Sequence, residues 1–302
     1  MPEAAAGVTR RSPASALLVS IRPKQWTKNL FVLSPLLFSQ HLFELDTFLH
    51  AAGAFLVFSM IASSVYLLND LVDAKKDREH PVKRLRPIAS GELPRPFAVL
   101  VLLLLLGGAI SGSVAVRPIF AVIVAGYFAL NVVYSMWLKE TVIIDVMSIA
   151  ASFVLRIVGG ALAISVPVSE WLLICTSLLA LFLGFSKRRH EITLLETNAS
   201  VHRPVLLEYN TYFLDQMISL VTASTLICYI LYTVADDTVL KFGSKNLLWT
   251  VPFVLYGLFR YLYLVHQKKT GGDPTAELLT DRPLLACVFL WAVAVMLVIY
   301  FR

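Results

Sequence analysis

The sequence predicts an all-α integral membrane protein with about nine transmembrane helices. Of its 302 residues, 58% are hydrophobic and only 15% are charged, whereas a soluble domain averages about 25% charged residues. The mean hydropathy is +0.74. The apolar residues also form runs that are long enough for helices to cross a bilayer. Together these three observations exclude an ordinary soluble domain.

Two short segments precede the first expected crossing. Residues 1–13 are small, polar and basic, which is typical of a disordered tail. Residues 14–21 are apolar but too short to span a bilayer, and no small-residue cleavage site follows them. We therefore expect a helix at the membrane interface rather than a signal peptide. Residues 14–302 are expected to form a single transmembrane domain.

Nine apolar segments of bilayer length follow along the chain. The first is the weakest, because Ser34, Pro35 and Ser39 interrupt it, and a count of eight or ten remains open. The segments comprise residues 29–43, 48–68, 97–116, 119–137, 141–165, 170–186, 212–234, 247–266 and 284–301.

The basic residues predict the orientation in the membrane. Twenty of the 26 Lys and Arg residues lie in the N-terminal region or in the loops after the second, fourth, sixth and eighth segments. Because basic loops stay in the cytoplasm, we expect a multi-pass plasma-membrane protein with a cytoplasmic N-terminus. Topology and contact with anionic lipid alone would explain these cations, but not the aspartates among them. The opposite side has only Arg117, Lys241, Lys245 and Arg302.

The most informative stretch is residues 69–87, which holds four carboxylates and six Lys or Arg side chains. On a helix, Asn69, Asp73 and Asp77 lie along one face because they are spaced by four, and Asp70 lies beside them. Carboxylates this close repel one another unless a cation lies between them. Oxygen ligands favour Mg²⁺, and the Lys and Arg that follow suit phosphate oxygens. The pattern indicates a magnesium–diphosphate site at the membrane surface.

A second charged cluster, Lys187-Arg188-Arg189-His190-Glu191, ends the sixth segment. Lys187 and Glu191 share a helical face, and we expect the cluster on the same membrane face as the aspartates, across the bundle. The alternative is an ordinary basic helix end, where cations favour the C-terminal dipole. The presence of the aspartate motif on the same face favours a functional role.

Two ionisable residues, Asp145 and Arg156, lie inside the fifth segment. They are eleven residues apart, so they point the same way but are separated by roughly 16 Å of helical rise. A direct ion pair is therefore not expected. Ionisable groups in a membrane usually face the bundle interior. Asp145 is near the cytoplasmic end and within reach of the site, whereas Arg156 is either functional or a structural anchor.

The N-terminal run from Arg22 to Asn29 places Lys24 and Lys28 one helical turn apart beside Trp26. The common explanation for this pattern is an interfacial belt of Trp and Lys. The more specific explanation is that the two lysines bind phosphate. The turn Gly271-Gly272-Asp273-Pro274 is interpreted only as a loop. The sequence contains no Walker loop, dinucleotide fingerprint, nucleophile elbow or His-rich metal motif.

The pattern Asn69-Asp70-x-x-Asp73-x-x-x-Asp77, continued by His80-Pro81-x-Lys83-x-x-Arg86-Pro87-Ile88-x-x-Gly91, resembles the first motif of the UbiA-type intramembrane prenyltransferases. The resemblance covers essentially the whole chain. It implies a helical bundle around a central cavity that opens sideways to the lipid, with a Mg²⁺-bound diphosphate beneath cytoplasmic caps. Most members carry an Asp-rich second motif where this chain has the basic cluster at residues 187–191.

This departure, with the N-terminal run and the turn at residues 271–275, resembles one branch of the family, the decaprenyl-phosphate phosphoribosyltransferases of mycobacteria and their relatives. The branch implies transfer of 5-phosphoribose from 5-phosphoribosyl 1-diphosphate to decaprenyl phosphate, or another polyprenyl phosphate, with release of pyrophosphate. The product would feed the synthesis of cell-wall arabinan, as in arabinogalactan. Bases in place of acids should weaken a second magnesium site and suit a donor with an additional phosphate.

The resemblance gives roles to particular residues. Mg²⁺ is assigned to Asn69, Asp73 and Asp77, with Asp70 behind them, and the residues expected to be catalytic are Asp73, Asp77 and Lys187. The expected partners are the two substrates. Nucleic acid is not among them, and a homo-oligomer is left open. The residues predicted to bind substrate phosphates are Lys24, Lys28, Lys83, Arg86, Lys139, Lys187, Arg188, Arg189 and Glu191.

Two other functions remain open from the sequence. One is prenyl transfer from a prenyl diphosphate to an aromatic acceptor, in which case the diphosphate belongs to the lipid. The other is transport. Transporters place their sites near the midplane at broken helices, whereas these charged residues are expected at the cytoplasmic rim.

Overall fold

The computed structural model describes residues 12–79, 83–197, 204–268 and 272–301. Within these ranges every regular element is a helix, as predicted. Nearly all of the predicted disordered tail and His80 and Pro81 of the first motif lie outside them. The long helices are α3 (Leu45–Val72), α6 (Arg95–Val116), α7 (Pro118–Met136), α8 (Ile144–Ala163), α9 (Glu170–Thr197), α10 (Thr211–Val234), α12 (Val251–His266) and α14 (Arg282–Tyr300).

Shorter helices connect these long ones at both ends of the bundle. The expected interfacial helix is present as α1, which begins after Ser12, whose hydroxyl accepts a hydrogen bond from the backbone N–H of Ser15. The short elements are α1 (Pro13–Ile21), η1 (Pro23–Leu33), α2 (Ser34–Phe38), α4 (Ala74–Glu79), η2 (Lys83–Leu85), α5 (Pro87–Ser90), η3 (Leu138–Glu140), η4 (Pro204–Glu208), α11 (Asp236–Phe242), η5 (Asn246–Thr250) and α13 (Pro274–Thr280).

The predicted count of nine transmembrane helices is not confirmed. In the described part of the chain, eight helices are long and apolar enough to cross a membrane, with η5 and α12 counted together. The expected first span, residues 29–43, is instead the end of the 3₁₀-helix η1 followed by the five-residue helix α2. Pro35, which lies where the two meet, cannot donate a backbone hydrogen bond to a continuous helix.

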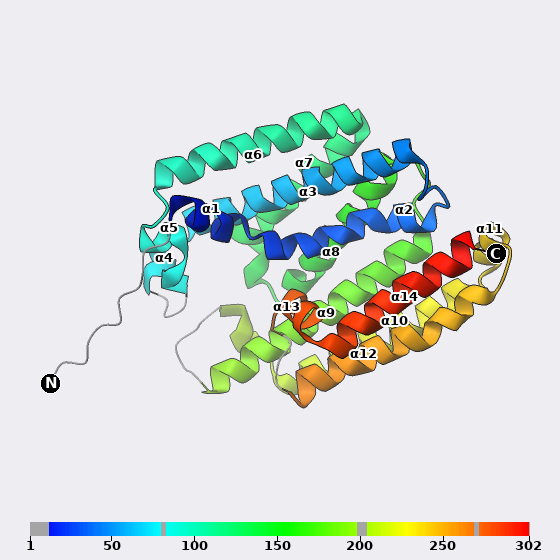
Figure 1. Cartoon of the computed structure of the whole chain (residues 1–302). Coiled ribbons are helices and arrows are strands. Elements are labelled where there is room, and N and C mark those ends of the chain that lie inside the picture. Colours follow the sequence, from blue (N-terminus) through cyan, green and yellow to red (C-terminus); the bar gives the residue numbers. More distant parts are fainter. Residues whose placement is uncertain (1–11, 80–82, 198–203, 269–271, 302) are drawn as a thin grey trace.

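The η1–α2 segment nevertheless runs beside α3 in the opposite direction (Figure 1). Near one end Trp26 Nε1 donates to Ser63 Oγ at 3.1 Å, and one turn later Asn29 Nδ2 donates to Ser59 Oγ at 3.2 Å. At its other end, α2 meets the last residues of α14, where the Tyr300 hydroxyl lies 3.3 Å from the Leu36 carbonyl oxygen. As a result, α1 and the end of α14 lie at opposite ends of the bundle (Figure 1).

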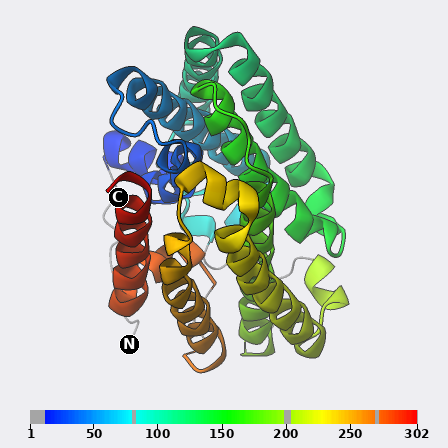
Figure 2. The same ribbon diagram turned by 90° about the vertical axis from the view of Figure 1, so that its right-hand side faces the viewer.

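Consecutive long helices pack side by side, and they form two groups (Figure 2). In the first group, α3, α6, α7 and α8 share a buried cluster that includes Phe58, Phe120 and Tyr127. The segment η1 packs against α3 and α8 so closely that a Cβ atom on Gly160 of α8 would lie 2.0 Å from the backbone oxygen of Val32. Only glycine fits at this contact. Small residues permit such backbone approach in membrane bundles, where packing drives helix association.

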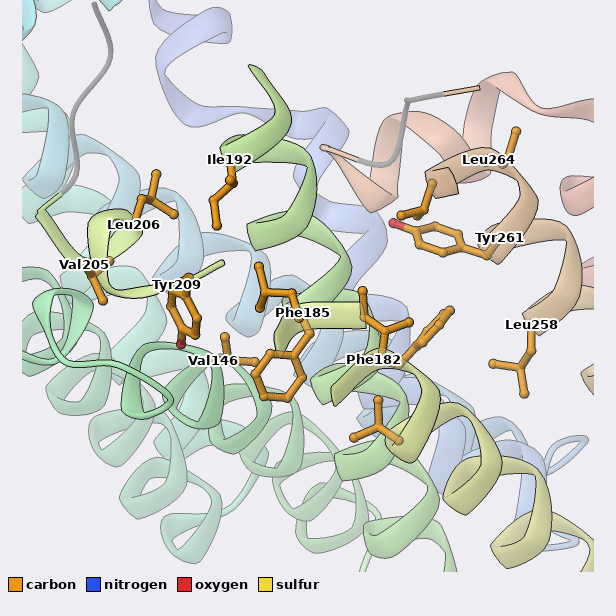
Figure 3. Close-up of a cluster of buried hydrophobic side chains, with 14 of the residues drawn as sticks. Val146, Phe182, Phe185, Ile192, Val205, Leu206, Tyr209, Leu258, Tyr261 and Leu264 are labelled. Atoms are coloured by element: carbon orange, nitrogen blue, oxygen red, sulfur yellow. The ribbon is translucent and has the colours of Figure 1, made fainter. Parts of the chain in front are cut away.

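The second group comprises α9, α10, α12 and α14, and its core lies toward the end of the bundle that carries the charged motifs. Figure 3 shows Phe182 and Phe185 of α9 between Tyr209 on one side and Tyr261 of α12 on the other. Val146 of α8 joins the same cluster, so the two groups are packed together there. This contact fixes the end of α9, and with it the second charged cluster, against the start of α8.

Candidate active site

The aspartate motif is built on a helical turn that continues from α3 into α4. The backbone N–H of Asp73 donates to the Asn69 carbonyl at 2.9 Å, and that of Asp77 donates to the Asp73 carbonyl at 2.8 Å. Because these hydrogen bonds have helical spacing, the three residues share a face, as the sequence predicted. Asp70 lies on the neighbouring side of the same turn.

Two arginines neutralise the buried carboxylates of this motif. Asp70 is only 2% exposed, and its Oδ1 accepts hydrogen bonds from Arg22 at 2.6 Å and from Arg86 at 3.1 Å. The same Nη1 atom of Arg86 also donates to Asp77 Oδ2 at 2.8 Å. A guanidinium group therefore lies between two carboxylates whose mutual repulsion the sequence had indicated. Arg22 comes from the start of η1, 48 positions away in the chain.

Asp73 is the most accessible carboxylate of the motif. Its side chain is 31% exposed, and the Lys139 ammonium group of η3 lies 4.0 Å from Oδ1. Amide and carboxylate oxygens are the hard donors that Mg²⁺ prefers, so Asn69, Asp73 and Asp77 have suitable chemistry for that ion. Among the described residues, no three His, Cys, Asp or Glu side chains already surround a common point. The donor set therefore fits a site completed by water and substrate oxygens.

Arg188, which was predicted to bind phosphate, points into the protein. Its side chain is fully buried, and Nε donates to Asp145 Oδ2 at 2.6 Å, Nη1 to Glu191 and Nη2 to the Tyr134 hydroxyl at 3.3 Å. All three guanidinium nitrogens thus meet oxygen atoms of the protein. This geometry favours a positioning role for Arg188, which ties α9 to α7 and α8. Glu191, also predicted at the phosphate site, is part of the same ion cluster.

Asp145 reaches this cluster, as its place in the chain suggested. Its second oxygen, Oδ1, accepts a hydrogen bond from the Tyr209 hydroxyl at 2.8 Å, and that hydroxyl accepts one from the Ile143 backbone N–H at 2.6 Å. Burial raises the pKa of Tyr209, so the phenol stays protonated and remains a donor. Arg188 and Tyr209 together satisfy a carboxylate that is itself fully buried.

Arg189 forms a separate ion cluster with Asp215 of α10. Its Nε and Nη2 donate to the Asp215 carboxylate, and His266 Nε2 of α12 lies 3.2 Å from Asp215 Oδ1. This arrangement connects three helices at the same end of the bundle. Lys187, the first residue of the basic cluster, is half-buried and lies one helical turn before Glu191.

Arg156 is an anchor for η1, one of the two roles the sequence left open. Its Nε donates to Asn29 Oδ1 at 2.9 Å, Nη2 to the Tyr127 hydroxyl at 2.7 Å, and Nη1 to the Ser152 carbonyl at 2.9 Å. Arg156 and Asp145 make no contact with one another in these networks, in agreement with the helical rise between them. The sequence gave no signal for Asn29 as the partner of Arg156, because 127 positions separate them.

The 3₁₀ geometry of η1 separates two lysines that were expected on one face. With three residues per turn, positions three apart eclipse one another, and positions four apart diverge by about 120°. Lys24 is accordingly exposed, while Lys28 is half-buried. Trp26 and Asn29 share the edge that contacts α3. Another edge carries Gln25 and Lys28 away from α3.

Lys28 lies among charged groups from the start of its own segment and from two other parts of the chain. Burial lowers its pKa to about 8, and the charges of Arg156 and Arg22 act in the same direction, while Asp273 opposes them. Asp273 belongs to the turn that was interpreted only as a loop. Its Oδ2 accepts a hydrogen bond from Gln25 Nε2 at 3.0 Å. The turn before α13 is therefore joined to the edge of η1 that carries Lys28.

Two cavities lie outside the aspartate motif and the buried Arg188 cluster. One, of about 510 Å³, is a shallow hollow along α10 beside Asp215 and Tyr212. The other, of about 210 Å³, lies between α2 and the start of α9, next to His41 and Lys241. The second one is at the end of the bundle opposite to the aspartate motif.

The remaining predicted phosphate ligand, Lys83, is half-buried. It is the first residue of η2, and Arg86 directly follows that element in the chain.

The described helices therefore form an apolar bundle that carries the aspartate motif and several cations at one end. The model of the UbiA prenyltransferase family matches residues 30–293. The chain therefore belongs to that family, which confirms the resemblance seen in the first motif.

Relatives of known name cover nearly the whole chain. It is 30% identical over 295 residues to the decaprenyl-phosphate phosphoribosyltransferase of Mycobacterium tuberculosis, spanning 95% of this chain and 96% of that protein. It is 31% identical over 298 residues to the protein of the same name from Mycolicibacterium smegmatis, spanning 95% and 93%. A UbiA homologue from Archaeoglobus fulgidus bound to GPP and Mg²⁺ matches with a TM-score of 0.69 and 18% identity, spanning 94% and 99%. The last likeness shows the fold.

Proposed function

We propose that this protein transfers 5-phosphoribose from 5-phosphoribosyl 1-diphosphate to a polyprenyl phosphate such as decaprenyl phosphate, releasing pyrophosphate. The observation that carries the proposal is the similarity, over 95% of the chain, to two relatives named for that activity. Lys187 at the end of α9 supports it, since a donor with three phosphate groups needs more cations than a prenyl diphosphate. The product would serve as a precursor for cell-wall arabinan.

The aspartate motif would hold the diphosphate of the donor. Asn69, Asp73 and Asp77 would bind Mg²⁺, which when present supplies charge neutralisation to the departing pyrophosphate. Arg86 lies between Asp70 and Asp77, so it is positioned to donate to a phosphate oxygen beside the metal. Arg22 and Asp70 keep that guanidinium in place.

The remaining cations of the proposed site come from other elements, and one of them, Lys139, lies 4.0 Å from Asp73 Oδ1. We assign Lys187 to the 5-phosphate of the donor, and the ion clusters of Arg188 and Arg189 hold the helix that presents it. Arg188 and Glu191 are then positioning residues rather than phosphate ligands. The further phosphate ligands in this proposal are Lys24, Lys28, Lys83 and Lys139.

The transfer itself requires orientation and charge stabilisation. The bond between the anomeric carbon and the diphosphate oxygen breaks, a bond from that carbon to an acceptor phosphate oxygen forms, and pyrophosphate leaves with the electron pair. The acceptor phosphate is already an anion at neutral pH, so no general base is required. Fixed cations stabilise the charge that develops on the leaving group. Holding the acceptor phosphate in line with the breaking bond lowers the entropic part of the activation barrier. The polyprenyl tail would lie along the apolar flank of the bundle.

Donor binding tests this assignment directly. Lys187→Ala should weaken the binding of 5-phosphoribosyl 1-diphosphate by about tenfold or more, since a charge-assisted hydrogen bond contributes about 1.5–3 kcal/mol. The loss should be smaller for an analogue that lacks the 5-phosphate. Titration calorimetry on detergent-solubilised protein measures both affinities, and Lys245→Ala, at an exposed lysine in another part of the chain, is the matched control. Tight binding of a prenyl diphosphate in preference to the ribose donor would instead support prenyl transfer, the function that the family name describes.

The affinity for this donor should fall as the pH rises through about 8. Burial lowers the pKa of Lys28 to about 8, whereas a bound phosphate would favour the ammonium form and raise that pKa. Above this pH, binding must take up a proton, so the dissociation constant should rise by up to about tenfold per pH unit. Lys28→Arg stays charged throughout and should remove the dependence. Affinities measured at about pH 7 and about pH 9 that change equally in both proteins would contradict the assignment of Lys28.

The active site is proposed to face the cytoplasm, with residues 29–43, which include the end of η1 and α2, forming the ninth crossing. In a protein whose three cysteines are replaced, a cysteine at Lys76 should react with an impermeant thiol reagent only from the cytoplasmic side. One at Lys245 should react only from outside. Both positions are exposed, and they lie at the ends that carry α4 and η5. The opposite pattern, with Lys76 labelled from outside and Lys245 from the cytoplasm, would overturn the proposed orientation.

A further inference from the structure

The turn before α13 is fixed against both halves of the charged site. A Cβ atom on Gly272 would lie 2.2 Å from the ring of His190, so this turn packs directly on the end of α9, next to the basic cluster. On its other side, Asp273 accepts the hydrogen bond from Gln25 of η1 at 3.0 Å. The helix α13 contacts η1, the segment between α1 and α2 in Figure 1. A segment 248 positions from Gln25 therefore contributes a carboxylate at this point.

The Asp273 side chain is held at both oxygens and still has capacity to bind a ligand. Oδ1 accepts from the backbone N–H of Thr275 at 3.1 Å, which caps α13, and Oδ2 accepts from Gln25. Both of these donors are neutral. The residue is exposed, and each carboxylate oxygen can accept a second hydrogen bond. The side chain is therefore an oriented acceptor that faces solvent.

The surroundings of Asp273 are cationic. Its charge raises the pKa of Lys28, one turn after Gln25 on the same edge of η1, and Arg22 and Arg156 act on that lysine in the opposite direction. Arg22 in turn binds Asp70 of the aspartate motif. A carboxylate among phosphate-binding cations would repel a phosphate. It is suited to accept hydrogen bonds from the uncharged, hydroxyl-bearing part of a phosphorylated substrate.

We infer that Asp273 accepts hydrogen bonds from the ribose hydroxyls of the donor and selects a sugar over a prenyl diphosphate. The inference rests on the proposed function and adds to it a residue that determines specificity. A prenyl chain has no hydroxyl groups, so it would leave this carboxylate without a partner while displacing its water. A site built to bond a hydroxyl rejects a substrate that lacks it more strongly than an apolar pocket rejects an added group.

A cycle of protein and substrate variants tests the inference. The steady-state kcat/KM is measured for 5-phosphoribosyl 1-diphosphate and for its 2-deoxy and 3-deoxy analogues, with wild-type protein, Asp273→Ala and Asp273→Asn. We expect at least one deoxy analogue to lower kcat/KM of the wild type by about tenfold or more. The same analogue should lower kcat/KM of Asp273→Ala by less than about twofold. Equal losses in both proteins for both analogues would overturn the inference.

The Asn variant separates recognition from a structural role. Asparagine is as good an N-cap as aspartate, so α13 and its contact with η1 should be retained. If Asp273 only caps α13, Asp273→Asn should match the wild type with every donor, which would count against the inference. If it binds a hydroxyl through its charge, Asp273→Asn should lose most of the preference for ribose while its melting temperature is unchanged. A wild-type protein that does not use the ribose donor at all would refute the proposed function instead.

Discussion

Asp73→Asn and Asp77→Asn are each expected to lower turnover by at least about 100-fold without preventing folding. Each substitution would remove a negative oxygen ligand from the proposed metal, and the loss of one such stabilising group costs about 10²–10³ in rate. In this proposal Asp73 has the larger role at the metal, because it is the most accessible carboxylate of the motif. Asp77 also accepts a hydrogen bond from Arg86 at 2.8 Å, so its substitution additionally weakens one of the two contacts that hold that guanidinium.

Turnover at increasing Mg²⁺ concentrations measures this effect, with Glu79→Gln as the matched control. Glu79 is an exposed carboxylate in the same helix as Asp77, so neutralising it changes the local charge equally without touching the ligand set. The control should retain wild-type turnover. EDTA should abolish activity, and Mg²⁺ should restore it. Full activity in chelator, or in either Asp variant, would refute the assignment of the metal.

The second large effect is expected from Arg188→Met, which should destabilise the protein by about 3–5 kcal/mol. The substitution leaves Asp145 and Glu191 without their shared cation, and an uncompensated buried carboxylate costs that much. Asp145 is fully buried, so water does not replace the lost partner. Since the cluster joins α7, α8 and α9, activity should fall together with stability.

Thermal unfolding in detergent measures this loss, and a second substitution gives the cause. Asp145→Asn in the Arg188→Met background removes the unpaired charge while keeping an oxygen that accepts from Tyr209, so part of the stability should return. Arg84→Met, at an exposed arginine of η2, should melt like the wild type. If Arg188→Met melted at the wild-type temperature, the ion cluster would not be a stabilising element of the fold.

The helices and the aspartate face were predictable because they depend on local patterns. Hydrophobic runs of bilayer length identify a span without knowledge of its neighbours. Likewise, Asn69, Asp73 and Asp77 share a face because the backbone remains helical through the end of α3. The end of the fifth segment that carries Asp145 could also be placed from the chain alone.

The segment η1 could not be predicted because its form depends on its contacts. The residues of η1 do not by themselves select a 3₁₀-helix over an α-helix, because neither form is excluded by a proline or glycine inside the segment. The structure that forms is set by the close approach of Val32 to Gly160 and by the hydrogen bonds of Trp26 and Asn29 to α3. The consequence for the site is direct, since the 3₁₀ period separates Lys24 from Lys28.

The partners of the charged residues could not be predicted because they lie far apart in the chain. The sequence showed that the clustered carboxylates need cations, but not that Arg22 and Arg86 lie next to them. It also gave no reason to associate Asp273 with Gln25. Such pairs depend on which helix ends meet, and that is decided by packing over the whole bundle.

The most direct test of the proposed function is the mass of the lipid product. Purified protein in detergent or vesicles is incubated with Mg²⁺, 5-phosphoribosyl 1-diphosphate and decaprenyl phosphate, and the lipid fraction is examined by mass spectrometry. We expect one new lipid whose mass equals the acceptor plus one phosphoribosyl group, with one equivalent of pyrophosphate released. Neither should appear when the acceptor is omitted. If the ribose donor is left unchanged, and a prenyl diphosphate with an aromatic acid gives a prenylated product instead, the chain is a prenyltransferase and the phosphoribosyl assignment is wrong.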